Sequence, residues 1–290
     1  MKRTSFILGK QKGKVKSFAR NKHKVDFAQI VKKVILESHI ILEILDSRFM
    51  DETRNKDIEH DIQSRHKKLI FVFNKSDLVN IKELKMKINR RGIKSYVIVS
   101  TKQRKGGQEL RNKIKIEASR IKKKQLQEGR VQVGVIGYPN SGKSSVINLL
   151  VGRPVAKTAF EAGFTKGMQK VKLAEGIFIF DTPGVVPRVE TKGEEGFVKH
   201  ASIGARNYDK IHEPEFVIGN IMMRYPGILE KYYGIDIMND VDALIETVGR
   251  RRGFLKKHDE VDVDRTSRYI LKEWQEGKIK VEEIEKLFDD

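Results

Sequence analysis

Short apolar runs rich in β-branched residues recur along the first two thirds of the chain, separated by helical or polar stretches. These runs occupy residues 40–45, 69–73, 96–99, 131–136 and 171–180. Runs that are apolar almost throughout are typical of strands buried on both faces of a parallel sheet. The pattern therefore predicts an α/β fold, a mostly parallel sheet with helices on both faces, and we expect the last run to form a hairpin.

Helical spacing of apolar residues predicts two helices around these strands. The first is expected to begin at Asp26, and its apolar positions are Phe27, Ile30, Val31, Val34 and Ile35. The second, over residues 111–130, is polar and rich in Lys, so we expect it to lie on the surface and to join the two halves of the sheet.

Beyond about residue 205 the apolar spacing is helical. One pattern, through Val241, Leu244, Ile245 and Val248, is expected to end at Gly249, and another, through Tyr269, Ile270 and Trp274, at Gly277. The chain is thus predicted to have an α/β domain over residues 25–205 and an all-α domain over residues 206–290.

The charge of the chain is strongly basic. Of its 290 residues, 59 are Lys or Arg and 39 are Asp or Glu, which leaves a net charge of +20. Residues 1–24 alone contain nine Lys or Arg and no acid, so they are predicted to form a basic arm. A polyanionic partner is expected, with nucleic acid as the default, although charge can also serve solubility alone.

Composition excludes some other classes. The chain has no Cys, so disulfides, thiolate metal sites and thiol nucleophiles are impossible. No run approaches the 18 or so apolar residues of a membrane span, and the amino terminus offers no apolar signal-peptide core. We therefore expect a cytoplasmic protein that does not bind membranes.

The segment Gly137–Ser145, GYPNSGKSS, matches the phosphate-loop pattern of a Gly, four residues and Gly-Lys-Ser. It follows an apolar strand and begins a helix, so backbone amides and a helix amino terminus converge on phosphates. Lys143 is expected to contact the β- and γ-phosphates, and Ser144 to bind magnesium. The residues predicted to bind nucleotide here are Pro139, Asn140, Ser141, Gly142, Lys143, Ser144 and Ser145.

The segment NKSD, residues 74–77, predicts a preference for guanine. Asp77 can accept two hydrogen bonds from the guanine edge, where adenine offers no matching donors. Lys75 is expected to lay its stem along the base, and Asn74 to link this loop to the phosphate loop. Ser76 completes the residues of this loop that are predicted to bind guanine. After the next apolar run, three residues are expected to contact the other edge of the base: Ser100, Thr101 and Lys102.

The segment DTPG, residues 181–184, completes the nucleotide motifs. Asp181 is expected to hold magnesium through water, and the Gly184 amide to sense the γ-phosphate. Thr165, in AGFTKG, is a candidate switch residue that closes on the metal, although an ordinary loop residue is equally expected there. Val185 follows where many GTPases carry the Gln that orients the attacking water, so intrinsic hydrolysis should be slow.

These motifs run in permuted order, because Asn74 precedes Gly137. In this order the chain resembles the circularly permuted GTPases of the YlqF/RbgA type over nearly its whole length. Further segments carry the resemblance: LDSRFMDETRN (45–55), AGFTKG, DTPGVV, YPGILEKYYGID (225–236) and GRRRGFL (249–255). Two positions depart from the family pattern, with Ser47 in place of Ala and Ala162 in place of Pro.

The resemblance implies a circularly permuted Ras-like GTPase domain, and a function in large ribosomal subunit assembly in which contact with the particle drives GTP hydrolysis. It also implies GTP or GDP, magnesium and potassium as cofactors. Potassium would be held partly by Asn140, and a catalytic His would come from the amino-terminal region, where only His23 is suitable. The partners implied are the large-subunit precursor and its rRNA, bound by a monomer.

Other interpretations stay open at this stage. The segment GRRRGFLKK contains five cations beside an aromatic residue, which fits either an RNA contact or a solvated basic turn: Arg250, Arg251, Arg252, Lys256 and Lys257. Asp46 and Arg48 end a predicted strand where ligands gather in such folds, yet a structural ion pair is the favoured role. An RNA scaffold with structural GTP, or a GTPase acting on tRNA or translation factors, are the alternative functions.

Overall fold

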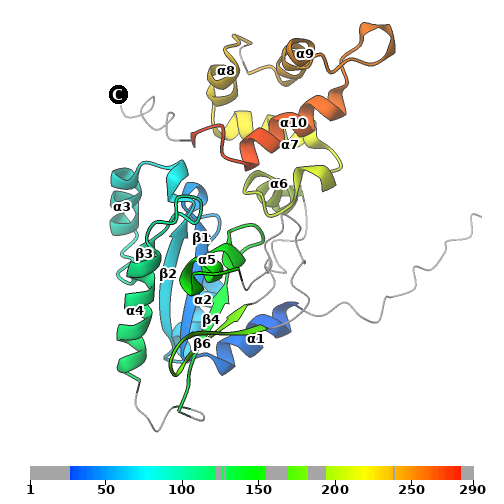
Figure 1. Ribbon diagram of the computed structural model, residues 1–290. Helices are drawn as coiled ribbons and strands as arrows, with labels where there is room; N and C mark the ends of the chain where they lie inside the picture. Colours follow the sequence, from blue (N-terminus) through cyan, green and yellow to red (C-terminus); the bar gives the residue numbers. More distant parts are fainter. Residues whose placement is uncertain are drawn as a thin grey trace, which may run out of the picture.

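A computed structural model describes residues 27–121, 126, 129–154, 169–181, 194–237 and 239–281. Its centre is a six-stranded sheet of order β3-β2-β1-β4-β6-β5 (Figure 1). The strands are β1 (Ile40–Asp46), β2 (Lys68–Asn74), β3 (Tyr96–Ile98), β4 (Val131–Ile136), β5 (Gln169–Ala174) and β6 (Ile177–Asp181).

All strand pairs are parallel except β5 and β6, which form an antiparallel hairpin. Ile40 to Asp46 of β1 pair in register with Lys68 to Asn74 of β2, so the carboxyl ends of these strands lie together. The α/β class, the mostly parallel sheet and the hairpin predicted from the apolar runs are confirmed.

Helices cover both faces of the sheet. On one face, Ile40, Leu42 and Ile44 of β1 share a buried cluster with α4 (Gly107–Ser119) and α5 (Lys143–Val151). On the other face, α1 (Phe27–Glu37) and α2 (Lys56–Ser64) pack around Ile41, and α3 (Ile81–Arg90) packs around Leu45. The alternation of side chains along β1 thus divides the core into two layers.

Two helix boundaries differ from the sequence prediction. Helix α4 begins at Gly107, four residues before the predicted start at residue 111, and its last residue is Ser119. Helix α9 (Val241–Arg252) continues past Gly249 and is capped by Gly253 in the left-handed conformation. Gly249 lies inside the helix because of close packing, since a Cβ there would lie 2.3 Å from Cγ1 of Val261. Packing therefore requires glycine at this position, and Gly249 does not end the helix.

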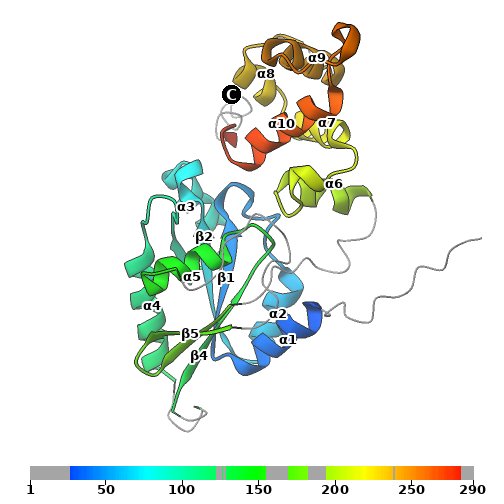
Figure 2. The same ribbon diagram turned by 45° about the vertical axis from the view of Figure 1, so that its right-hand side comes forward.

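A group of helices follows the hairpin and lies beyond one end of the sheet in both ribbon views (Figures 1 and 2). Its members are α6 (Glu194–Ser202), α7 (Pro214–Arg224), α8 (Ile228–Tyr233), α9 and α10 (Val263–Gln275). They enclose one apolar cluster around the fully buried Trp274. None of the helices in the described ranges is long and apolar enough to cross a membrane.

The apolar cluster of the helical part extends into the α/β part. Phe49, which follows β1, and Tyr138 of the phosphate loop are both buried in it. Ala201, Ile203 and Ala205, which precede the predicted domain boundary, are buried there as well. The two parts of the chain are therefore joined by packing as well as by the polypeptide.

Glu43 is a buried acid in the middle of β1, with only 1% of its surface exposed. Its Oε1 accepts a hydrogen bond from the Asn55 amide at 3.0 Å, while Oε2 has no hydrogen-bond partner within the described residues. Burial raises the pKa of Glu43 to about 8, and the nearby charge of Glu59 adds to the rise. The native protein therefore holds a proton that the unfolded chain releases near pH 4.5.

Replacing Glu43 by Gln is expected to stabilise the protein by about 3 kcal/mol at pH 7. Native Glu43 has a raised pKa, so its contribution to stability is complete below pH 4.5 and is lost as pH rises through about 8. Gln keeps the Asn55 contact and removes this loss. Urea unfolding at pH 5.5, 7 and 8.5 should show a gain that grows with pH. Glu37→Gln, at a partly exposed position of α1, should show none, and a Glu43→Gln protein less stable than wild type at pH 8.5 would contradict the account.

Candidate functional site

The loop between β4 and α5 has the backbone shape of a phosphate cradle. Gly137, Asn140 and Gly142 all have positive φ, at 146°, 60° and 95°. Lys143 is 94% buried, and its Nζ donates to the carbonyl oxygens of Gly137 at 3.1 Å and Tyr138 at 2.8 Å. The loop thus wraps around an ammonium group, as a phosphate-binding loop requires.

Helix α5 begins at Lys143, directly after this loop. Its amino-terminal cap, Gly142, provides no side-chain hydrogen bond to the first turn. The first-turn amides and the positive end of the helix dipole therefore favour an anion at this position. Ser144 and Ser145 lie in the same turn and are partly exposed, which suits a hydroxyl ligand for magnesium at the phosphates.

Asn74, the last residue of β2, joins three loops. Its side-chain Nδ2 donates to the Ser141 carbonyl oxygen at 2.9 Å, and its Oδ1 accepts from the Thr101 amide at 3.3 Å. A Cβ at Gly142 would lie 2.1 Å from Asn74 Nδ2, so a glycine is needed where the two loops meet. The NKSD loop, the loop at residues 100–102 and the phosphate loop therefore meet at one edge of the sheet, and Asn74 makes the link expected from the sequence.

Asp77 is held in one orientation by its neighbour. It lies in a short 3-10 turn over Ser76–Leu78, and its Oδ1 accepts a hydrogen bond from the Ser100 hydroxyl at 2.6 Å. Ser76 is fixed through its amide, which donates to the Val99 carbonyl oxygen at 3.2 Å. Such a fixed carboxylate suits recognition of adjacent N–H groups on a base. Lys102 is exposed at the rim of this loop.

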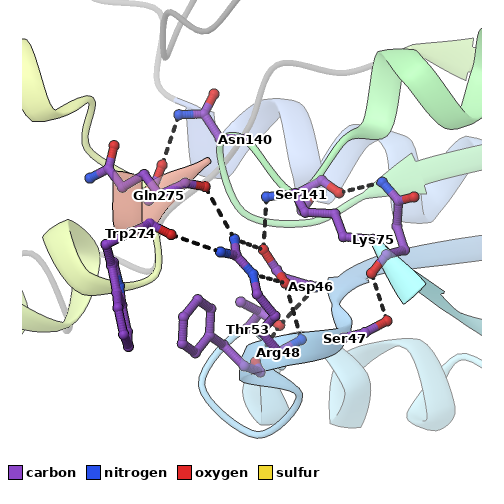
Figure 3. A network of polar contacts seen from close by, with 12 residues as sticks. Asp46, Ser47, Arg48, Thr53, Lys75, Asn140, Ser141, Trp274 and Gln275 are labelled. Atoms are coloured by element: carbon purple, nitrogen blue, oxygen red, sulfur yellow. Dashed lines mark hydrogen bonds and ion pairs between the residues drawn. The ribbon is translucent and has the colours of Figure 1, made fainter. Parts of the chain in front are cut away.

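Lys75 has a contact that the sequence did not predict. Its backbone is left-handed, with φ at 60°, and its Nζ donates to Oδ2 of Asp46 at 2.7 Å. Arg48 holds the same carboxylate with two nitrogens, at 3.1 and 2.8 Å (Figure 3). Burial acts to raise the pKa of Asp46, but Arg48 and Lys75 outweigh it and hold that pKa below its usual range. The buried carboxylate is therefore ionised and shared by two cations.

Arg48 also reaches the helical part. One guanidinium nitrogen donates to the carbonyl oxygen of Trp274 at 3.0 Å, and the other to that of Gln275 at 3.4 Å. These are the last two residues of α10, whose carbonyl groups lie beyond the regular hydrogen bonds of the helix, and the Trp274 carbonyl oxygen also accepts from the Gly277 amide at 3.0 Å. A structural ion pair of Asp46 and Arg48 is thus present, as favoured from the sequence, but its contact with α10 was not anticipated.

Asn140 of the phosphate loop also contacts the helical part. Its side-chain Nδ2 donates to the Gly204 carbonyl oxygen at 2.7 Å (Figure 3). The amide group is thus engaged with the segment after α6 in this structure. A role for Asn140 as a potassium ligand stays a prediction, and it would have to use the amide oxygen or a rearranged side chain.

Three of the predicted catalytic and switch residues lie outside the described residues: His23, Thr165 and Gly184. Val185, Ala162 and the basic arm over residues 1–24 lie outside them as well. Asp181 ends β6, beside β4, but its side chain is not among those described. Within the described part there is no group of three or more His, Asp or Glu that could hold a metal ion.

The basic segment that begins with the last turn of α9 is largely engaged with its own surroundings. Arg250 is paired with Glu246 and Asp259, Arg251 donates to the Tyr233 carbonyl oxygen, and Arg252 lies over the Tyr269 ring. Lys256 and Lys257 are exposed. An RNA contact through this segment stays a prediction. Only those arginine N–H groups that make none of these contacts would be available to bind RNA.

The chain is similar in sequence to known GTP-binding proteins. Residues 132–214 match a family model described as a 50S ribosome-binding GTPase. An uncharacterized GTP-binding protein of Methanocaldococcus jannaschii is 39% identical over 260 residues, which are 88% of this chain and 66% of that protein. The nucleolar GTP-binding protein 2 of Saccharomyces cerevisiae is 33% identical, over 85% of this chain and 51% of its own length.

Two solved structures share the permuted fold. A GDP-bound structure of YlqF has a TM-score of 0.62 at 23% identity, over 86% of this chain and 95% of that one. A GNP-bound YlqF from T. maritima has a TM-score of 0.61 over 88% and 95%. The chain has the circularly permuted GTPase fold of YlqF. It spans two thirds or less of the length of these curated relatives. The activities and partners of those longer proteins therefore do not apply directly to this YlqF-like chain.

Proposed function

We propose that this YlqF-like chain binds GTP and hydrolyses it while acting in assembly of the large ribosomal subunit. The observation that carries the proposal is the hydrogen bond from Asn74 to Ser141, which places the guanine-reading loop beside the phosphate loop. The relatives named as nucleolar GTP-binding proteins, and the family model named for ribosome binding, support the cellular context.

The geometry supports separate roles for the loops that bind the base and the loop that binds the phosphates. Asp77, oriented by Ser100, reads the guanine edge, and Thr101 and Lys102 line its other side. Lys143 leaves the carbonyl groups of Gly137 and Tyr138 to bind the β- and γ-phosphates together with the first-turn amides of α5. Magnesium, when bound, neutralises charge on the phosphates, with Ser144, Thr165 and Asp181 proposed as the residues that hold it.

Hydrolysis is proposed to be slow in the protein alone. Val185 cannot orient a water molecule, so the particle, a potassium ion at Asn140, or His23 would have to complete the site. The Gly184 amide is proposed to contact the γ-phosphate. This contact is proposed to change the position of the helical part, which follows Gly184 in the chain. The basic arm and Arg250, Arg251, Arg252, Lys256 and Lys257 are proposed to contact rRNA, in a cytoplasmic monomer.

Cosedimentation with large-subunit precursor particles tests the partner. We expect the protein to sediment with particles in the presence of a non-hydrolysable GTP analogue and to be released at least about fivefold more in GDP. Equal sedimentation in both nucleotides would exclude a nucleotide-controlled association.

Two alternatives predict other results. An RNA scaffold with structural GTP predicts that Lys143→Ala supports growth and sediments as wild type does. A GTPase acting on tRNA or translation factors predicts that RNA crosslinked to the protein in cells has tRNA sequences rather than large-subunit rRNA.

A further inference from the structure

The guanine-reading loop and the end of α10 are connected through one buried carboxylate. Lys75 and Arg48 both bind Asp46, and Arg48 continues to the carbonyl groups of Trp274 and Gln275 (Figure 3). The side chains of Arg48 and Asp46 are each only 1% exposed, so solvent does not screen this chain of contacts.

The chemistry of the contacts explains why they act together. Arg48 has a planar fork that can bind a carboxylate and still direct nitrogens elsewhere. The carboxyl end of α10 carries the negative end of the helix dipole, which favours a cation there. If α10 moves away, Arg48 loses its carbonyl partners, and a buried cation without all of its partners is costly.

Lys75 is the point at which this affects the nucleotide. Burial lowers the pKa of Lys75, and the charge of Asp46 offsets part of that effect. Asp46 therefore both fixes the position of the ammonium group and favours its charged form, while the stem of Lys75 is the part expected to lie along the base. A base resting on that stem would in turn hold Lys75 against Asp46.

We propose that Arg48 is a positioning residue for guanine recognition, acting through Asp46 on Lys75, and that docking of α10 and binding of the guanine base strengthen each other. This inference rests on the proposed guanine site. It differs from signalling by the γ-phosphate, which GDP and guanosine lack. It predicts that GDP, and even guanosine, strengthens the docking of α10.

Other contacts between the two parts provide a matched control. Arg224 of α7 forms an ion pair with Glu52, and its side chain is 50% exposed. That pair joins the same two parts of the chain but does not include Asp46 or Lys75. Arg224→Ala therefore removes an Arg from the interface without touching the guanine loop.

Calorimetric titration with GDP is the first test. Arg48→Ala should weaken GDP binding about tenfold, whereas Arg224→Ala should leave it within about twofold of wild type. In an Asp46→Asn background, Arg48→Ala should have no further effect, because the two residues act in series. Unchanged affinity in Arg48→Ala, or full additivity with Asp46→Asn, would overturn the inference.

Arg48→Lys keeps the test valid if Arg48→Ala does not fold. A lysine ammonium group can bind Asp46 but cannot also reach the α10 carbonyl groups. GDP affinity should then fall by no more than about threefold, while docking of α10 no longer responds to GDP.

Energy transfer between two dyes measures that docking. The chain has no Cys, so single cysteines can replace two exposed residues, Met86 in α3 and Val263 at the start of α10. In mild urea, GDP should raise the ratio of docked to undocked molecules at least about fivefold in wild type and in Arg224→Ala, and leave it unchanged in Arg48→Lys. A wild type that binds GDP without this response, or an Arg48→Lys protein that responds as wild type does, would overturn the inference. A wild type that does not bind GDP at all would overturn the proposed function with it.

Discussion

Replacing Asp77 by Asn is expected to weaken GDP binding by at least about a thousandfold and to create binding of xanthosine diphosphate. The carboxylate accepts hydrogen bonds from two N–H groups of guanine, and an amide nitrogen placed there would face one of them without an acceptor. Xanthine carries a carbonyl oxygen where guanine has its amino group, so the Asn amide can donate to it. The Ser100 hydroxyl, 2.6 Å from Asp77, can still orient the new side chain.

Equilibrium titration with guanosine and xanthosine diphosphates measures this exchange. Asp57→Asn removes the same charge from an exposed position in α2 and should change neither affinity. If Asp77→Asn bound GDP as wild type does, Asp77 would not contact the base. The guanine assignment would then be wrong even if the phosphate loop were functional.

The replacement of Lys143 by Ala is expected to weaken GDP and GTP binding at least about a hundredfold and to leave guanosine binding unchanged. The ammonium group is buried between two loop carbonyl groups, and the phosphates are the partners for which it is proposed to leave them. Guanosine has no phosphate, so its affinity reports only the base site.

A set of paired titrations with guanosine and GDP separates this effect from misfolding. Lys113→Ala, which removes another partly buried lysine bonded to a carbonyl group, should bind both ligands as wild type does. Loss of guanosine binding in Lys143→Ala would indicate a disrupted fold. Unchanged GDP binding would contradict the assignment of the phosphate loop.

The meeting of the motif loops at one edge of the sheet could be predicted from the sequence because its determinants are local. A parallel sheet brings the carboxyl ends of its strands to one edge, so motifs that directly follow β2, β3 and β4 must meet there. The link from Asn74 to the phosphate loop is an example of a long-range contact that follows from motif order alone.

The contacts between the two parts of the chain could not be predicted in this way. Arg48 and Trp274 are more than two hundred residues apart, and nothing in either segment indicates that a side chain will meet the end of α10. Tyr138 lies in the phosphate loop, yet it is buried with Trp274 in the helical cluster. A large aromatic residue in such a loop was the one available signal.

The helix end wrongly predicted at Gly249 has a related cause. Gly249 resembled a helix terminator because glycine often ends helices, but here a neighbouring Val261 leaves no room for a side chain. Tertiary packing requires a glycine at this position, and such packing cannot be predicted from the local sequence pattern. The site residues that fall outside the described ranges, His23, Thr165 and Gly184, stay predictions.

The rate of phosphate release from GTP, measured with and without large-subunit precursor particles, tests the central claim most directly. In magnesium and potassium, we predict that particles raise the rate at least about tenfold, and that ATP is not hydrolysed under either condition. A rate that particles do not change, or equal hydrolysis of ATP, would contradict the claim that this chain is a guanine-specific GTPase of ribosome assembly.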